Sequence, residues 1–571
     1  MPVLGLREEL LLRSLALGSV VAGCWFWTWW LVSGHGEWTT PAIGVTVLLA
    51  WAFALPAYFF FFICRMTRPN PARPVPALRA AMVVTKVPAE PWPLVRATLE
   101  AMLAQELADG AAPRHRTRRA QGRARGRAPG GAPGGAPTTT RAHDTWLADE
   151  CPSETTLRWC LEHGVKVSSR FGVAEYHQPC WPRRTRSKEG NLAYFYDTVG
   201  YRSYDVVVQL DADHVPAPGY LEAMLRPFAD PKVGYVAGPS ICDSNVEEGW
   251  TVRGRLYREA SMHGPVQAGC NGGWAPVCIG SHYAVRTAAL RAVGGLGPEL
   301  AEDYSTTLWL QSGGWAGVFS IDAEAHGEGP PTVEEMLLQE RQWARSLSTI
   351  LVRWAPGRLR RAPLRARVRL GFALLFYPLQ TAALLGATVA PIAGVVFATS
   401  WGQTSLAGFY LHLWPSSVVT VATIAYLRRR HLLRPRRAKL WSWELLLFQL
   451  VRWPWVLVGI VEGAYAGVRS RVVTFKVTPK TDGQLKALSV RAVAPCLVLG
   501  AVPAWVVVAE VRGASIGLVL VTALQAVTYL LCAVAVVALH LVGNHRRLLR
   551  GGRASIVGPP AGDSRTPDIG R

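Results

Sequence analysis

Long apolar stretches constrain the fold of this chain more than any other feature of its sequence. Two of them open the chain, at 15–33 and 42–64, and each supplies the roughly 20 apolar residues that a helix needs to cross a bilayer. After a more polar central segment, further stretches lie near 369–398, 405–427, 441–467, 489–509 and 515–543. A water-soluble core does not need stretches of this length, so the sequence predicts an integral, multi-pass membrane protein.

The basic segments between these stretches indicate which ends lie in the cytoplasm. The segment RMTRPNPAR follows the second stretch, and the loops 428–439 and 469–480 are also basic. Basic loops stay on the cytoplasmic side, and both loops can do so only if 441–467 does not cross the membrane. That stretch also carries charged residues and a proline, so we expect it to form interfacial or re-entrant helices. The sequence then predicts about six spans in the plasma membrane, two before and four after a large cytoplasmic insert.

The central segment has the rhythm of an α/β domain. Short strand-like runs such as MVVTKVP and YDVVVQLDAD alternate with amphipathic helical runs between residues 66 and 365. This alternation predicts a mainly parallel sheet, whose ligands bind beyond the carboxyl ends of the strands. We therefore expect a two-span hairpin (1–65), a cytoplasmic α/β domain (66–365), a C-terminal transmembrane region (366–545) and a disordered tail (546–571).

An arginine-rich segment interrupts the α/β domain at 110–143. It contains eight arginines, Gly-Ala-Pro repeats and no acidic residue. Such a segment buries too little apolar area to fold, so we expect a disordered loop. Its charge suits contact with the headgroups of membrane lipids. No aromatic interleaving or recognisable module accompanies it, so no nucleic-acid partner is expected.

Two aspartates follow the strand-like run VVVQL, at Asp211 and Asp213. Residues two apart in an extended chain share a face, so these carboxylates lie side by side and repel each other unless a cation lies between them. Mg²⁺ and Mn²⁺ prefer oxygen ligands and often bind substrate phosphates at the same time. The pair is typical either of a turn or of a site for a divalent metal and a nucleotide, and its spacing fits both.

Segments elsewhere in the chain favour the second interpretation. From about residue 80 to 480 the chain resembles the membrane-embedded family-2 glycosyltransferases, especially the cellulose synthase-like, processive β-glycan synthases. The resemblance rests on Asp149 in ADE, Lys188 in KEGN, Asp211 and Asp213 in DAD, Glu302 and Asp303 in AEDYS, Gln339, Arg341 and Trp343 in QERQW, and Phe475, Val477, Thr478 and Lys480 in FKVTPK. Gln342 stands where that family usually has arginine.

The resemblance implies a GT-A-like glycosyltransferase fold for the α/β domain, inserted between transmembrane helices. It also implies a donor site. Asp149, Lys188 and Asp211 would bind a nucleoside-diphosphate sugar, and Asp213 would hold Mg²⁺ or Mn²⁺.

The remaining segments imply the catalytic and acceptor residues. Glu302 and Asp303 form the catalytic pair, with Asp303 as the general base that takes the proton of the acceptor hydroxyl. The loop 470–485 would close over the nucleotide as a gating loop. The acceptor would be bound by Gln339, Arg341 and Trp343.

The resulting hypothesis is an inverting transferase that uses UDP-glucose or a related donor. It would elongate a β-linked polysaccharide at the cytoplasmic face and translocate it across the membrane. The expected partners are the sugar donor, the growing glycan, membrane lipids, and accessory export or periplasmic and cell-wall proteins. Two alternatives stay open. One is a non-processive transferase acting on a lipid or short acceptor, which Gln342 favours, and the other is a transporter or regulatory protein with a degenerate transferase domain.

Overall fold

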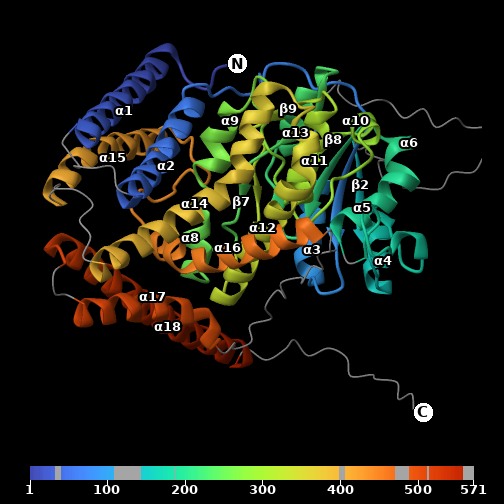
Figure 1. Ribbon diagram of the computed structural model, residues 1–571. Coiled ribbons are helices and arrows are strands. Elements are labelled where there is room, and N and C mark those ends of the chain that lie inside the picture. Colours follow the sequence, from blue (N-terminus) through green and yellow to red (C-terminus); the bar gives the residue numbers. More distant parts are fainter. Residues whose placement is uncertain are drawn as a thin grey trace, which may run out of the picture.

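The computed structural model describes residues 1–32, 40–107, 143–185, 187–397, 406–469, 488–510 and 514–556, with side chains up to residue 545 (Figure 1). The predicted arginine-rich insert up to residue 142 and the gating loop 470–485 lie outside the described residues, as does the end of the tail. The last helix runs on to Ile556, past residue 546, where we expected a disordered tail to begin.

A seven-stranded sheet forms the centre of the α/β domain, in the order β3-β2-β1-β4-β8-β6-β9. Its strands from β1 to β4 are parallel, as predicted, but β8 runs antiparallel to both of its neighbours. The sheet is mixed because β8 returns to it after a long helical segment. The alternation of strands and helices in the sequence does not predict in which direction such a strand runs. The strands are Ala80–Lys86 (β1), Asp144–Asp149 (β2), Lys166–Ser168 (β3), Val206–Asp211 (β4), Val233–Ala237 (β6), His282–Arg286 (β8) and Ala316–Phe319 (β9).

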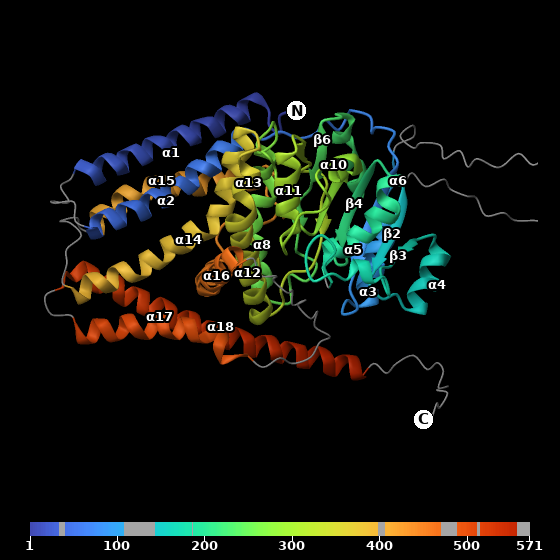
Figure 2. The same ribbon diagram turned by 45° about the vertical axis from the view of Figure 1, so that its right-hand side comes forward.

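Helices cover both faces of this sheet (Figures 1 and 2). The helices that contact the strands are α3 (Trp92–Leu103), α4 (Glu154–His163), α5 (Lys188–Phe195), α7 (Tyr220–Leu225), α10 (Thr287–Ala292) and α11 (Glu302–Ser312). The other helices of the domain pack mainly against helices: α6 (Tyr201–Ser203), α8 (Trp250–Glu259), α9 (Gln267–Gly269), α12 (Val333–Thr349) and α13 (Ala355–Leu359).

Strand β1 shows why the centre of the sheet is so apolar. Its side chains alternate between the two faces, and both faces are covered. Met82 and Val84 lie in one buried cluster with Leu99 of α3, whereas Ala81 and Val83 lie in a second cluster with residues of α5. A strand buried on both sides needs apolar residues along most of its length, and AAMVV supplies them before Thr85 and Lys86 end the strand at the ligand-binding edge.

A three-stranded sheet lies beside the carboxyl end of β4. It consists of β5 (Val215–Pro216), β10 (Ala325–His326) and β7 (Ser240–Ile241), in the order β5-β10-β7. Because β5 begins two residues after Asp213, the pairing of β5 with β10 fixes the chain just beyond that aspartate.

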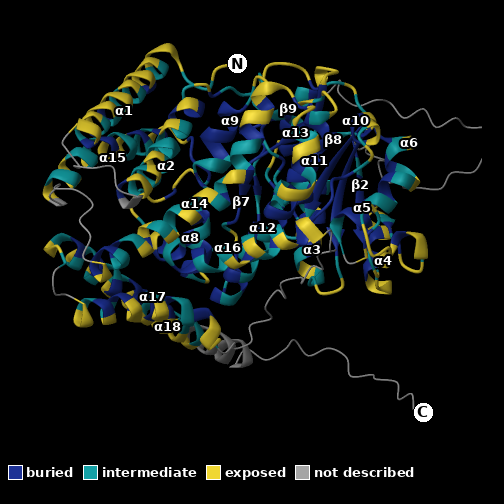
Figure 3. Ribbon diagram, in the orientation of Figure 1, coloured by how far each residue is buried: buried dark blue, intermediate teal, exposed yellow. Residues whose placement is uncertain are grey.

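Seven long helices make up the rest of the described structure: α1 (Leu6–Val32), α2 (Thr40–Ile63), α14 (Leu364–Val396), α15 (Leu406–Arg429), α16 (Trp443–Arg469), α17 (Val490–Ala509) and α18 (Ile516–Ile556). Six of them are long and apolar enough to cross a membrane, which agrees with the predicted number. Their exposed side chains include many apolar ones, such as Val32 at 76% and Val508 at 83% exposure (Figure 3). The chain is a multi-pass membrane protein, because exposed apolar surface of this extent is stable in lipid.

The composition of the six helices differs from the prediction at one place. Helix α16 is long and apolar enough to count as a candidate membrane span, whereas α15 is not among the candidates. We predicted the opposite, with a span at 405–427, where α15 lies, and an interfacial segment at 441–467, where α16 lies. Figure 2 shows α15 running alongside α1 and α2, in line with α14, α17 and α18, whereas α16 is seen end-on beside α12. Helix α16 therefore lies across the direction of the others, which is how an interfacial helix would lie, and its interfacial placement stays a prediction.

Helix α12 connects the α/β domain to the long helices and packs along α16. Its Glu340 is buried, 3.1 Å from Nη1 of Arg258 on α8 and in contact with the guanidinium of Arg452 on α16. The hydroxyl of Tyr377 on α14 donates to the same carboxylate at 3.4 Å. Burial opposes the charge of Glu340, but the two arginines outweigh it and hold the pKa of Glu340 below its ordinary value. One carboxylate therefore ties helices of the α/β domain to long helices of the bundle.

Removing this carboxylate should destabilise the protein strongly. In Glu340→Gln two buried guanidinium groups lose their counter-charge, and breaking a buried ion pair costs about 3–5 kcal/mol. We expect that loss in the free energy of unfolding of the full-length protein in detergent, followed by tryptophan fluorescence.

The matched control lies on the same pair of helices. Glu462 of α16 pairs with Arg341 of α12, but its side chain is 33% exposed, so Glu462→Gln should cost at most about 1 kcal/mol. Equal losses in the two variants would contradict a buried ionic connection at Glu340.

Candidate active site

The carboxyl ends of neighbouring parallel strands bring the first two predicted residues to one edge of the sheet. Asp149 ends β2 and Asp211 ends β4, and β1 lies between these strands. In the register of the sheet Lys86 is opposite Asp149, and Thr85 is opposite Asp211. The edge where we predicted ligand binding therefore carries both aspartates.

Lys188 joins the aspartate pair to the acidic pair further along the chain. It is the first residue of α5, whose N-terminus is capped by the hydroxyl of Ser187. Its Nζ lies 2.5 Å from Oδ1 of Asp211, 2.5 Å from the carbonyl oxygen of Gly280 and 3.8 Å from Oε1 of Glu302. Burial disfavours its charge, but Asp211 and Glu302 outweigh burial and raise the pKa of Lys188. One cation thus contacts segments that are far apart in the sequence.

Asp149 is fully buried, and its carboxylate already has a partner. Oδ2 lies 3.0 Å from Nζ of Lys86, and the backbone N–H of Cys151 donates to Oδ1 at 3.0 Å. No motif pointed to Lys86, although its position at the end of β1 places it at the same edge. In this conformation the predicted nucleotide ligand Asp149 faces Lys86.

Three side chains form a group that could hold a metal ion. Ligand atoms of Asp211, Asp213 and His214 all lie within 4.8 Å of one another. Nδ1 of His214 is 3.1 Å from Oδ1 of Asp213, and its Nε2 is 3.0 Å from Oγ of Ser240. Carboxylate oxygens suit Mg²⁺ or Mn²⁺, and the imidazole adds a nitrogen ligand, so the donor set fits a divalent ion. No sequence motif indicated His214, although it directly follows Asp213.

The acidic pair begins helix α11, with Glu302 buried and Asp303 partly buried. The backbone N–H of Tyr304 donates to Oδ1 of Asp303 at 2.7 Å. Burial raises the pKa of Asp303 to about 6 and raises that of Glu302 well above its ordinary value. A Cβ added to Gly280 would lie 3.2 Å from Oδ2 of Asp303, so the absence of a side chain at Gly280 leaves room for this carboxylate. An aspartate with a raised pKa, near the cation of Lys188, has the properties of a general base.

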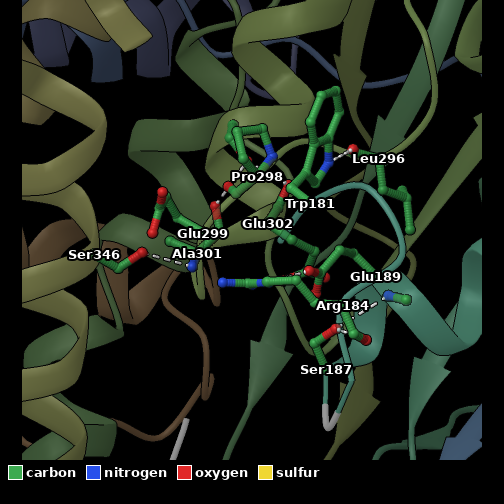
Figure 4. A network of polar contacts seen from close by, with 12 residues as sticks. Trp181, Arg184, Ser187, Glu189, Leu296, Pro298, Glu299, Ala301, Glu302 and Ser346 are labelled. Carbon is green, nitrogen blue, oxygen red and sulfur yellow. Dashed lines mark hydrogen bonds and ion pairs between the residues drawn. The ribbon is translucent and has the colours of Figure 1, made fainter. Parts of the chain in front are cut away.

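A network of polar contacts fixes the two loops that carry Lys188 and the acidic pair (Figure 4). Nε of Arg184 donates to Oε1 of Glu189 at 2.5 Å, and Nε1 of Trp181 donates to the carbonyl of Leu296 at 2.7 Å. The backbone N–H of Ala301 donates to Oγ of Ser346 on α12 at 2.8 Å. The distance between Lys188 and Glu302 therefore depends also on residues that belong to no sequence motif, namely Trp181, Arg184 and Ser346.

The predicted acceptor residues on α12 do not all share one face. Nη1 of Arg255 on α8 donates to Oε1 of Gln339 at 3.1 Å, and its guanidinium carbon lies 4.7 Å from the ring centre of Trp343. Gln339 and Trp343 are one helical turn apart, so a single arginine can hold both. Arg341 instead pairs with Glu462 of α16. The structure thus separates Arg341 from the other two residues and adds Arg255, which no motif had indicated.

A chain of polar contacts leads from Arg255 back to the aspartate pair. Nε of Arg255 is 3.3 Å from Glu259, and Glu259 is 3.9 Å from Nδ1 of His263. The same nitrogen of His263 is 3.0 Å from the carbonyl oxygen of Ser240, whose hydroxyl contacts His214. The candidate acceptor residues and the candidate metal residues are therefore parts of one connected site.

Comparisons with known proteins identify the family of the chain. Residues 206–539 match the sequence model described as "Glycosyl transferase family group 2". The cellulose synthase catalytic subunit [UDP-forming] of Xanthomonas axonopodis pv. citri (strain 306) is 27% identical over 210 residues, which are 36% of this chain and only 27% of that relative's length.

Two solved structures show weaker likenesses. Glucosyl-3-phosphoglycerate synthase from Mycobacterium tuberculosis, in complex with Mn²⁺, UDP and glucosyl-3-phosphoglycerate, is 15% identical, with 47% of this chain and 78% of that chain covered and a TM-score of 0.28. GalNAc-T7 with UDP, GalNAc and Mn²⁺ is 12% identical, with coverages of 62% and 58% and a TM-score of 0.29.

The family match runs from the strand that ends in Asp211 to helix α18 and so includes more than half of the chain. It includes strands β4 to β10 of the GT-A-like α/β domain together with the later long helices, whereas β1 to β3 precede it. This chain therefore belongs to the family-2 glycosyltransferases.

Proposed function

We propose that the chain is an inverting glycosyltransferase that elongates a β-linked polysaccharide from a nucleoside-diphosphate sugar, UDP-glucose or a related donor. It would act at the cytoplasmic face of the plasma membrane and translocate its product. The observation that carries this proposal is the position of Lys188, between Asp211 and Glu302 at the carboxyl edge of the sheet. A cation there would attract a diphosphate, and the neighbouring carboxylates would serve the metal and the acceptor.

The donor would lie along this edge. Lys188 would neutralise part of the charge of the diphosphate, and Asp211 would contact the nucleoside. Asp149 would do the same if Lys86 turned toward the phosphates. A divalent ion, when bound by Asp213 together with Asp211 and His214, would supply further positive charge to the leaving diphosphate.

The transfer itself requires one bond to form and one to break. The acceptor hydroxyl oxygen attacks the anomeric carbon, the bond from that carbon to the diphosphate oxygen breaks, and the diphosphate leaves with the electron pair. The proton of the hydroxyl passes to Asp303. A single displacement of this kind inverts the anomeric centre, so an α-linked donor gives a β-linked product.

The acceptor would be held on α12. The ring of Trp343 offers a flat surface for the terminal sugar, and Gln339 offers a hydrogen-bonding amide. Arg255 would act as a positioning residue, because it contacts both side chains and orients them. Arg341 has no such place in this scheme, since it pairs with Glu462. The gating role of Phe475, Val477, Thr478 and Lys480 stays a prediction, because these residues lie outside the described part of the chain.

Processive elongation is supported by the arrangement of the helices around α12. This helix packs on α16, and Glu340 in the middle of its acceptor segment contacts α14 and α16. A glycan end bound at Trp343 would thus lie against helices that belong to the membrane region. A transporter or regulatory protein with a degenerate domain has less support, because the chain retains the lysine and all the carboxylates that the chemistry needs.

The product formed by the purified protein tests the proposed function. Full-length protein in lipid nanodiscs, supplied in turn with radiolabelled UDP- and GDP-sugars, should convert one of them into a long polymer. A β-specific glycosidase should degrade that polymer. Products of only one or two sugars would replace this proposal by the non-processive alternative, and an α-linked product would contradict inversion.

Replacing the proposed base should remove most of the transferase activity and the dependence of kcat on pH. Asp303→Asn should lower kcat by roughly 10²–10⁴-fold and leave UDP binding unchanged. The base works in its deprotonated form, so with a raised pKa of about 6 the wild-type kcat should fall about tenfold per pH unit below pH 6.

The residual kcat of Asp303→Asn should not show this decrease below pH 6. Asp230→Asn, in a turn far from the site, is the matched control and should keep the wild-type profile. A wild-type profile in Asp303→Asn would exclude Asp303 as the base.

Removing divalent ions should abolish turnover and weaken nucleotide binding. Excess EDTA should stop sugar transfer, and Mn²⁺ or Mg²⁺ should restore it. UDP affinity, measured by calorimetry, should fall in EDTA, and in Asp213→Asn it should be low and insensitive to added metal. Full activity in chelator would contradict the metal assignment.

A further inference from the structure

A cavity of about 240 Å³ lies at the junction of the α/β domain and the long helices. Four segments meet around it: the residues before α1, the residues after α2, the loop after α15, and the turn between β9 and β10. Its lining is rich in cations, with only Asp322 as an acid. The arginines that line it are Arg68, Arg430, Arg434 and Arg436.

Two of these arginines are engaged within the protein. Arg434 is buried, with Nη2 donating to the carbonyl of Ile321 at 3.1 Å and Nε 2.8 Å from Glu324. Arg430 contacts the carboxylate of Glu8 at the start of α1. These contacts hold the walls of the cavity together.

The other two arginines have capacity for a ligand. The side chain of Arg436 is 58% exposed and shares the carboxylate of Glu324 with Arg434. Nε of Arg68 is buried and makes no hydrogen bond to any described residue, and its nearest carboxylate, Asp322, is 3.9 Å away. A buried hydrogen-bond donor without a partner destabilises the folded protein, and an anionic acceptor bound there would remove that cost. Together, Arg68 and Arg436 offer an anion two guanidinium groups.

The cavity lies at the level where helices would leave the bilayer. Helix α1 begins at Leu6, α2 ends at Ile63 and α15 ends at Arg429, and Figure 2 shows these ends on the side of the α/β domain. Apolar side chains, among them Leu4 and Leu432, also line the cavity. Phosphate groups of lipids lie at this level, and basic pockets between transmembrane helices bind anionic headgroups there.

We propose that this cavity binds the phosphodiester headgroup of an anionic phospholipid. Arg68 and Arg436 would each donate to phosphate oxygens in the forked geometry that guanidinium groups favour. Leu4 and Leu432 would contact the apolar part of the lipid below the phosphate. The site is separate from the transferase site and depends only on α1, α2 and α15 reaching the membrane surface.

A bound lipid would also stabilise the catalytic domain. The cavity includes Asp322, in the turn that leads into β10, and β10 pairs with β5 just after Asp213. A ligand that binds only the folded protein raises its stability in proportion to its occupancy. We therefore expect anionic lipid to protect the folded protein against heat.

Titration with defined lipids tests the proposal. Full-length protein in neutral detergent is mixed with phosphatidylglycerol, phosphatidylcholine or inorganic phosphate, and both binding and melting temperature are followed by tryptophan fluorescence. Phosphatidylglycerol should bind and raise the melting temperature, whereas phosphatidylcholine and phosphate should do neither. The double variant Arg68→Gln/Arg436→Gln should bind phosphatidylglycerol about 30-fold more weakly, because the loss of each positive charge near the membrane surface weakens binding about fivefold.

Matched arginines outside the cavity provide the control. Arg73 and Arg437 are exposed, lie near the same segments and do not line the cavity, so Arg73→Gln/Arg437→Gln should bind like the wild type. If the first double variant fails to fold, Arg436→Gln alone should still weaken binding about fivefold.

Three outcomes would overturn the proposal. One is equal loss in both double variants, which would indicate non-specific attraction to basic surface. The second is protection by inorganic phosphate equal to that by the lipid, which would indicate a site for a free anion. The third is no effect of phosphatidylglycerol on the wild type. Activity is not used as a readout, so failure here would leave the proposed transferase function untouched.

Discussion

The site depends on one partly buried cation. Lys188 lies between Asp211 and Glu302 and contacts the backbone of Gly280, so carboxylates from two distant segments share its charge. Without it these groups would repel each other in a poorly hydrated environment, and folding would have to protonate or separate them. The same positive charge faces the region where a diphosphate would lie. The contacts of Lys188 with these carboxylates thus involve the same charge that a diphosphate would use in the proposed function, and Lys188 lies at a helix start capped by Ser187.

A second buried group performs a similar task between the domain and the bundle. Glu340 of α12 pairs with Arg258 of α8 and with Arg452 of α16. It belongs to the segment of α12 that carries Gln339 and Trp343. Movement of α16 or α14 would therefore shift the acceptor residues, because a paired buried charge cannot easily lose its partner. If the chain has the proposed function, this connection would couple sugar transfer, through α12, to passage of the product.

Sequence patterns predicted much of the fold and part of the site. Alternating strand and helix runs predicted the parallel half of the sheet, and the rule that ligands bind at carboxyl ends placed Asp149 and Asp211 at one edge. The antiparallel strand β8, the pairing of Asp149 with Lys86 and the proximity of Arg255 to Trp343 were not predicted. Each depends on residues brought together from separate segments, and local periodicity contains no information on such contacts.

The sequence by itself determined the class of the protein: apolar stretches of membrane length around an α/β domain, and acidic motifs at strand and helix ends, are local patterns with direct physical meanings. Tertiary structure alone decided which of these residues act together. Arg341 belongs to the same motif as Trp343, yet helical geometry turns it toward Glu462. His214, Ser240 and Arg255 belong to no motif considered, yet packing makes them part of the site. Electrostatic contacts act over a few ångströms in space, and only the folded chain defines those distances.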